Sequence, residues 1–210
     1  ELIKRYRDIS MMADVDAAIE DIVNDAISYV DAEKPVSINL DETGLSASVK
    51  KSIAAEFNSV LKMLDFKVRS QDYFRRWYID GRLYFHKVID TDNPRAGIKD
   101  VRYIDPRKIT KVRNVKKDKN PNGATFIKDI EEYYIYSDKG LSSKHGKYEA
   151  PENKANALKI TKDAIAYCPS GLVDYDKNMA LSYLHKAIRP ANQLRMMENA
   201  VVIYRITRAP

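Results

Sequence analysis

The run from Tyr183 to Pro210, YLHKAIRPANQLRMMENAVVIYRITRAP, constrains the fold more than any other part of the sequence. Its apolar residues follow a helical spacing as far as about Ala200. Pro190 lies inside that stretch, where a proline removes one backbone hydrogen bond and bends a helix. Val201 to Tyr204 then has the composition of a β-strand, with no turn residue before it. The run therefore predicts a helix over residues 177–200, bent at Pro190, followed by a strand that lacks a partner within this sequence.

The rest of the chain predicts an α+β fold in which helices come first and a mainly antiparallel sheet follows. Its 210 residues, 44% of them apolar, suffice for one core and one protruding element. Apolar residues at helical spacing predict helices over residues 11–30, 46–64 and 70–79, the last ended by Gly81. Alternating patterns predict strands over residues 36–40, 82–90, 101–104, 109–115, 131–136 and 160–167. We expect polar loops at 116–123 and 137–158, and we expect the chain, which begins at Glu1, to be part of a longer polypeptide.

Several classes of protein are disfavoured by composition. No run approaches the roughly 18 apolar residues that span a membrane, and no signal peptide opens the sequence. One cysteine, Cys168, excludes an internal disulfide and a cysteine-based metal cluster, and we expect a buried structural thiol there. The three histidines are scattered, and no nucleotide-binding or zinc-protease motif is present. We therefore expect no cofactor and no bound metal.

Charge is divided unevenly along the sequence, although the net charge is only +6. Residues 8–65 carry about −8, residues 95–119 about +7 and residues 177–208 about +5. Such a division suits self-association through complementary patches, or a nucleic acid bound on one face. A solvated surface of mixed charge is the commoner explanation of any single charged run.

Two basic segments could bind nucleic acid. In the first, Arg75 and Arg76 lie among aromatic residues that could stack on bases, but helical spacing favours a core role for Tyr73, Phe74 and Trp77. The second is a basic hairpin that could contact DNA or an acidic neighbour, and it could equally be a charged solvent face. Its candidate interaction residues are Arg113, Lys116, Lys117 and Lys119.

Carboxylates near the predicted strand ends raise the alternative of a metal-dependent nuclease. Asp105 lies close to Lys108, and two carboxylates with a lysine could hold Mg²⁺ for phosphodiester cleavage. The spacing is unspecific, because acidic residues are common at turns for local hydrogen-bonding reasons. The acidic residues concerned are Asp90, Asp92, Asp105, Glu131 and Glu132. A DNA-binding adaptor that forms no ring is a further alternative.

Longer stretches of the sequence resemble one family. These are YRDISMMADVDAAIEDIVNDAI, FRRWYIDGRLYFHKVID, GIKDVRYIDPRKITKVR, IAYCPSGLVD and the closing run from Tyr183. Together they resemble the portal proteins, or head-tail connectors, of T-even-type tailed bacteriophages. The resemblance extends from Tyr6 to Pro210 and is weakest over residues 117–157.

This resemblance implies a structural subunit, with no enzymatic activity and no cofactor, in a ring of twelve copies at one capsid vertex. The ring would be the channel for packaging and ejection of double-stranded DNA. Residues 1–176 would form the N-terminal part of the wing domain, residues 177–200 the first stem helix, and residues 201–210 the start of the clip. The rest of the clip, the second stem helix and the crown would follow.

The resemblance also implies partners. They are further copies of the chain, the terminase large subunit, the major capsid protein and scaffold, the neck and tail proteins, and DNA passing without sequence preference. A host membrane would be a partner only during head assembly. The protein would be found in the virion, and in the host cytoplasm while heads assemble.

Roles for stem residues follow from the same resemblance. Leu181, Leu184, Ile188 and Leu194 would pack against other stem helices, and Pro190 would bend the helix within a tapering ring. Lys186, Arg189 and Arg195 would either face the DNA channel or form salt bridges between subunits, and we favour the salt bridges.

Overall fold

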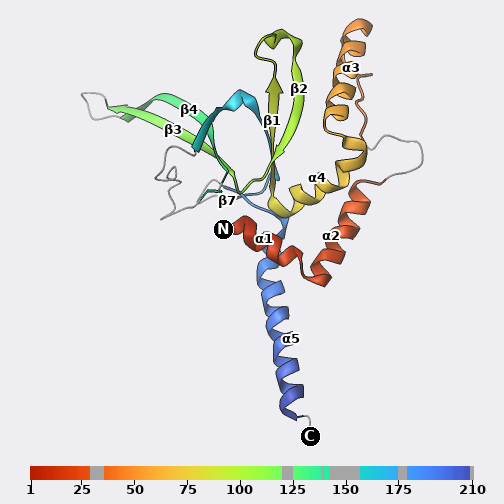
Figure 1. The fold of residues 1–210 in the computed structure, drawn as a ribbon, viewed down its shortest axis with the longest axis vertical. Coiled ribbons are helices and arrows are strands. Elements are labelled where there is room, and N and C mark those ends of the chain that lie inside the picture. Colours follow the sequence, from red (N-terminus) through yellow and green to blue (C-terminus); the bar gives the residue numbers. More distant parts are fainter. Residues whose placement is uncertain (29–35, 120–124, 139, 142–156, 175–178, 209–210) are drawn as a thin grey trace. The chain divides into compact units, whose positions relative to one another are not determined.

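The computed structural model describes residues 1–28, 36–119, 125–138, 140–141, 157–174 and 179–208, with the backbone alone for 116–119 and 125–129. Its helices, antiparallel strands and long C-terminal helix confirm the expected α+β class (Figure 1). The chain forms two compact units. Unit 1 comprises residues 1–82 and 169–210, and unit 2 comprises residues 83–168.

Unit 1 is mainly helical. Its helices are α1 (Leu2–Ser10), α2 (Ala13–Ala26), α3 (Ala47–Met63), α4 (Phe66–Asp80) and α5 (Ile188–Arg208), and the short 3₁₀ helix η4 (Tyr183–Ala187) leads directly into α5. A small hairpin of β7 (Val173–Asp174) and β8 (Met179–Ala180) precedes η4. Within this unit α4 contacts α1, α2, α3 and η4. It is therefore the element on which the unit is organised.

The core of unit 1 joins the two ends of the sequence. Its buried members come from α1, α2, α4 and η4, and they are Tyr6, Ile19, Val23, Ile79 and Leu184. Phe74 and Tyr78 pack against this core, and Trp77 contacts the rings of Phe74 and Tyr183. Phe74 and Trp77 therefore pack with the core and its neighbours, as their helical spacing predicted.

An ion pair fastens α1 to the end of α4. Nε and Nη2 of Arg7 donate to the two carboxylate oxygens of Asp80 at 2.9 and 2.6 Å. The Asp80 side chain is only 2% exposed, so its charge depends on this two-point contact. Losing the arginine would leave a buried carboxylate without its cation, which is strongly destabilising.

Gly81 ends α4 in a left-handed conformation, with φ of +72°. A glycine adopts this conformation without steric cost, and it commonly terminates a helix. The position is also crowded, because an added Cβ would lie 2.5 Å from the carbonyl oxygen of Leu181 and 2.7 Å from the nitrogen of Ser182. Gly81 therefore permits both the turn out of α4 and the close approach of the segment that leads to α5.

Unit 2 consists of two three-stranded sheets. The first sheet has the strand order β2 (Ile98–Ile104), β1 (Arg82–Ile89), β6 (Ile165–Pro169). The second has the order β3 (Ile109–Lys119), β4 (Thr125–Ser137), β5 (Ala157–Thr161). The 3₁₀ helix η1 (Pro94–Ala96) lies between β1 and β2 in the sequence, and η3 (Lys162–Ala164) carries the chain from β5 into β6. The pairs β1–β2, β3–β4 and β4–β5 are antiparallel, as expected.

Aromatic residues join the two sheets of unit 2. Tyr84 on β1 stacks on Tyr167 with ring centroids 4.9 Å apart, and it meets Tyr134 of β4 edge-on at 6.0 Å. Ile109 and Ile165 complete the buried cluster. Burial raises the pKa of the Tyr134 hydroxyl, so this ring stays neutral and apolar around neutral pH.

Several predicted boundaries need correction. Residues 36–40 form no strand, because alternation alone does not make one when no neighbouring strand supplies hydrogen bonds. The strand predicted over 160–167 is two strands in different sheets, separated by the polar turn η3. Residues 116–119, predicted as loop, continue β3 and pair with β4. The sequence prediction also missed α1, a short helix of nine residues.

We predict that Gly81→Ala lowers the free energy of unfolding by roughly 2–4 kcal/mol, through backbone strain and overpacking. Urea titration of the chain, followed by fluorescence of its single tryptophan, Trp77, would measure the change. Gly171→Ala is the matched control, because Gly171 also has a positive φ (+85°) but nothing lies within 4 Å of the added Cβ. Equal losses for the two variants would show that the close approach of Leu181 contributes nothing.

Candidate functional site

The most unusual feature of unit 1 is the helix α5, which runs without interruption from Ile188 to Arg208. Val201 to Tyr204 belong to this helix, so the prediction of a terminal strand is wrong. β-branched residues prefer strands mainly because they pack well on a sheet surface. That preference is weak for residues that pack on no sheet. An established helix, in contrast, extends at little cost for each added residue.

The start of α5 also differs from the prediction. The helix begins at Ile188 rather than at residue 177, and it is preceded by β8 (Met179–Ala180), a two-residue link and η4 (Tyr183–Ala187). Pro190 is consequently the third residue of α5 and not the middle of a longer helix. A proline is tolerated in the first turn, where its missing N–H costs little. The expected bend in mid-helix is therefore wrong.

Almost all of α5 is exposed. Every residue from Asn192 to Arg208 is exposed, whereas Ala191 is buried. The exposed apolar side chains are Leu194, Met196, Met197, Val201, Val202, Ile203, Tyr204 and Ile206, and Met196 and Ile206 reach 71% and 69%. At 100° per residue these positions surround the helix instead of forming one stripe. A helix that is apolar on all sides is normally buried.

The surface of α5 carries both apolar and charged side chains. No helix in the described part of the chain is both long enough and apolar enough to cross a bilayer. Cations also interrupt the apolar surface, at Arg195, Arg205 and Arg208, with Glu198 as the one acid in the helix. The surface of α5 is suited to contact with other protein segments that bring both apolar groups and carboxylates.

The three candidate cations of the predicted stem lie at or near the start of α5. Lys186 is in η4, and Arg189 and Arg195 are in α5, and all three are exposed. The structure records no ion pair between these side chains and the residues it describes. They are therefore available to an anionic group outside this chain.

The four leucine and isoleucine positions predicted to meet neighbouring helices have different surroundings. Leu184 is 5% exposed in the core of unit 1, and Ile188 packs against the same core. Leu181 is half-buried, whereas Leu194 is exposed. The prediction for Leu184 is corrected, because its side chain is already covered by its own unit, and Ile188 is partly covered in the same way. Leu194 has the exposure that contact with another subunit requires.

Hydrogen bonds attach the residues before α5 to the end of α4. Ser182 is fully buried, and its hydroxyl donates to the carbonyl of Tyr78 at 3.0 Å and accepts from the N–H of Leu184. The hydroxyl of Ser170 donates to the carbonyl of Leu181 at 2.5 Å, and its N–H donates to the carbonyl of Gly81 at 2.9 Å. We call these residues, together with Gly81, the α5 junction. The junction fixes the start of the helix against unit 1.

Unit 2 carries a group of cations around one carboxylate. Nζ of Lys162 and Lys111 lie 2.8 and 3.2 Å from Glu132, and Nε of Arg113 lies 3.8 Å from it. Hydrogen bonds from Lys162 and Lys111 hold the pKa of Glu132 below its usual value of 4.5. We call these four residues the Glu132 cluster. It contains Arg113 of the predicted basic hairpin, whereas the side chains of Lys116, Lys117 and Lys119 lie outside the described residues.

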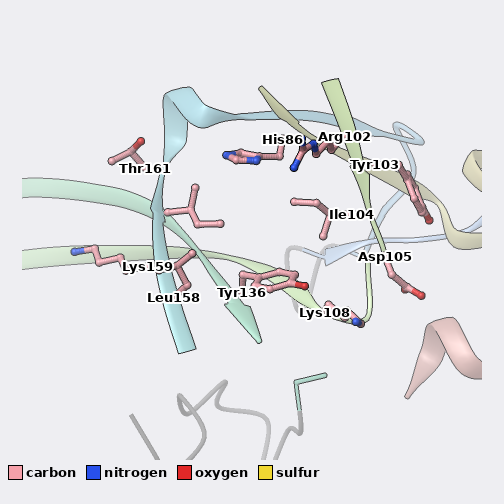
Figure 2. A pocket seen from close by; sticks show the side chains of 11 residues that line it. His86, Arg102, Tyr103, Ile104, Asp105, Lys108, Tyr136, Leu158, Lys159 and Thr161 are labelled. Atoms are coloured by element: carbon pink, nitrogen blue, oxygen red, sulfur yellow. The ribbon is translucent and has the colours of Figure 1, made fainter. Parts of the chain in front are cut away.

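Unit 2 also contains an open hollow of about 860 Å³. Its lining residues include His86, Arg102 and Ile104 from β1 and β2, and Leu158, Lys159 and Thr161 from β5 (Figure 2). The other lining residues are Tyr103, Asp105, Lys108, Tyr136 and Ile160. Carboxylates already pair with its cations, since Arg102 contacts Asp100, Lys108 contacts Asp138 and Lys159 contacts Glu131. The charges of the hollow are thus matched, and they indicate no particular ligand.

The carboxylates proposed for a nuclease do not converge in the described part of the chain. No three His, Cys, Asp or Glu side chains gather there in an arrangement that could hold a metal ion. Asp105 is bound by Arg107, Asp90 by Lys99 and Glu131 by Lys159. Cys168 is exposed, which corrects the expected buried thiol.

Comparison with known proteins gives one consistent result. The model of the family described as bacteriophage T4-like portal protein (Gp20) matches residues 1–210. The portal protein of Vibrio phage KVP40 is 40% identical over 213 residues, covering 100% of this chain and 40% of the relative. The portal protein of Salmonella phage ViI is 32% identical over 214 residues, covering 100% of this chain and 38% of the relative. The chain thus spans about two fifths of the length of these relatives.

We predict that Glu132→Gln reduces the acid sensitivity of unit 2. A carboxylate with a lowered pKa contributes stability above its unfolded-state pKa, and that contribution is lost as the pH falls through the folded-state pKa. The wild-type protein should therefore lose stability below about pH 4.5 more steeply than the variant. Thermal unfolding followed by circular dichroism between pH 3 and pH 7 would measure both slopes.

Asp92→Asn is the control for this experiment, because Asp92 is exposed and the structure records no ion pair for it with the described residues. It should leave the slope unchanged. Parallel slopes for Glu132→Gln and the wild type would contradict the role given to the Glu132 cluster.

Proposed function

Because the chain belongs to the family of bacteriophage T4-like portal proteins, we propose that it is part of a subunit of a portal ring of twelve copies at one vertex of the virion capsid. The ring would be the channel through which double-stranded DNA is packaged and later ejected. The chain itself is α+β with a long exposed helix. Since it spans only part of its relatives, the functions of the whole protein are proposed for the parent polypeptide.

The observation that carries this proposal is the exposed apolar surface of α5 beyond Ala191. Burying an exposed aliphatic side chain stabilises by about 1.5–3 kcal/mol. A stem helix in a ring gains this stabilisation from helices of its own polypeptide and of the two neighbouring subunits. An apolar surface on every side of the helix suits contacts of this kind.

We propose a division of the chain adjusted to the observed helix. Residues 1–176 would belong to the wing domain, and α5, from Ile188 to Arg208, would be the first stem helix. The stem would thus include residues first assigned to the clip. The rest of the clip, the second stem helix and the crown would lie in the remainder of the parent polypeptide.

A DNA channel sets a limit on how strongly its wall can bind phosphate. Each phosphate neutralised by a cation adds affinity that depends on salt, and tight contacts would slow translocation. We propose that Lys186, Arg189 and Arg195 mainly pair with carboxylates of neighbouring subunits, which leaves few free cations toward DNA. Replacing them with glutamine should then weaken the ring more than it changes DNA passage.

The proposed role is structural and needs no catalysis by this chain. ATP hydrolysis would belong to the terminase large subunit docked on the ring. The capsid protein, the scaffold and the neck and tail proteins would bind other surfaces of the subunit, and a host membrane would be involved only while heads assemble. The nuclease alternative predicts Mg²⁺-dependent DNA cleavage that is lost in Asp105→Ala or Glu131→Ala.

Electron microscopy of the full-length parent protein tests the proposal. Class averages viewed down the particle axis should show twelvefold rings with a central opening wide enough for duplex DNA. Monomers or dimers under all assembly conditions would rule out the ring. DNA-binding and cleavage assays would then decide between an adaptor and a nuclease.

We predict that Val202→Asp with Ile206→Asp in the full-length protein lowers the ring fraction at least tenfold. A buried unpaired carboxylate is strongly unfavourable, and both side chains are more than half exposed in the isolated chain, so the folded units should be unaffected. Val68→Asp adds a carboxylate at an exposed apolar position of α4, outside the proposed stem, and is the control. Native mass spectrometry measures the ring fraction, and normal rings from the double variant would argue against α5 as a buried stem.

A further inference from the structure

Helix α2 in unit 1 presents a face on which every charged residue is an acid. Its 14 residues include five acids and no base. Asp16 is bound by Arg75 of α4. Asp14, Asp21 and Asp25 lie on the opposite side from the buried Ile19 and Val23, because positions seven and eleven residues apart share one face of a helix.

This acidic face is not explained by the stability of α2 itself. Asp14 lies in the first turn, where a carboxylate interacts favourably with the helix dipole. Asp25 lies in the last turn, where the dipole is unfavourable for it, and no base is present in that turn. The structure records no ion pair for Asp14, Asp21 or Asp25 with the residues it describes. A cationic surface outside unit 1 would relieve their mutual repulsion.

The Glu132 cluster in unit 2 has the complementary excess of positive charge. Three cations, Lys111, Arg113 and Lys162, share the carboxylate of Glu132. Even when Asp163, the neighbour of Lys162 in the sequence, is included, cations outnumber carboxylates there. Arg113 and Lys162 are 54% and 61% exposed, so both can reach a further anionic group.

The spacings of the two surfaces agree. Asp21 and Asp25 are about 6 Å apart along the axis of α2, from a rise of 1.5 Å per residue. Lys111 and Arg113 lie on one face of β3, where two residues span about 7 Å. A carboxylate pair on the helix can therefore meet a cation pair on the strand.

We propose that the acidic face of α2 docks on the Glu132 cluster of a second copy of this chain. A ring requires two different, complementary surfaces on each subunit, because a self-complementary surface yields a closed dimer. The chain offers such a pair, an acidic helix face in unit 1 and a cation-rich sheet face in unit 2. The inference rests on the proposed ring.

The test is a charge exchange in the full-length protein, read out as the ring fraction by native mass spectrometry across a series of salt concentrations. Arg113→Glu alone and Asp21→Lys alone should each lower the ring fraction at least tenfold at low salt, since each places like charges opposite one another. The double variant, which restores opposite charges, should recover to within about threefold of the wild type.

Two controls carry the same charge changes elsewhere. Arg95→Glu alters an exposed cation of unit 2, and Glu56→Lys alters an exposed acid of α3, and both should assemble as the wild type does. Circular dichroism melts of all variants would establish that the subunits are folded.

The outcomes separate this inference from the proposed function. A wild-type protein that forms no ring contradicts the proposed function. Rings that form normally from both single variants, or single losses that the double variant does not repair, overturn the docking of α2 while the portal ring stands. Loss of binding to capsid protein or scaffold, with normal rings, would assign the acidic face to that partner and also overturn the proposal.

Discussion

The close approach of Leu181 to Gly81 is the constraint on which the arrangement of α5 depends. It brings the segment before η4 against the end of α4, at a position where even one added methyl group would collide with the backbone. Ser170 and Ser182 then satisfy the backbone groups that this approach buries. Buried polar groups are costly when unpaired. The close approach is therefore stable only while these hydrogen bonds are made. Through them the helix begins from a fixed position.

A helix fixed at its start has a clear physical consequence. Nucleation is the expensive step in helix formation, and η4, held by the α5 junction, leads straight into the first turn of α5. The remaining residues propagate the helix with little help from packing, which is why α5 can be regular and exposed at once. The apolar surface that it exposes is of the kind that other protein segments cover.

Sequence patterns correctly predicted the helices and strands that depend mainly on their own local sequence. The apolar faces of α3 and α4, the stop at Gly81 and the alternation in β1 needed no information beyond the local sequence. The errors concern residues whose structure depends on contacts with segments distant in the sequence. Val201 to Tyr204 were predicted as a strand because their composition suits a sheet, yet no strand in the described part of the chain pairs with them. Leu184 was predicted to pack against a neighbouring subunit. The core that buries it is built from α1, α2 and α4, which lie far away in the sequence.

Apolar contacts and charges would contribute differently to an assembly of such subunits. Burial of apolar surface is non-directional, so the all-round surface of α5 can stabilise a bundle without fixing which neighbour meets which. Charged surfaces add selectivity, because like charges placed opposite each other are strongly unfavourable. Unit 1 carries the acidic face of α2, and unit 2 carries the excess cations around Glu132. In the proposed ring, separating the two signs onto different units would give each copy a preferred orientation toward the next, and a chain with both signs mixed on one surface would lack it.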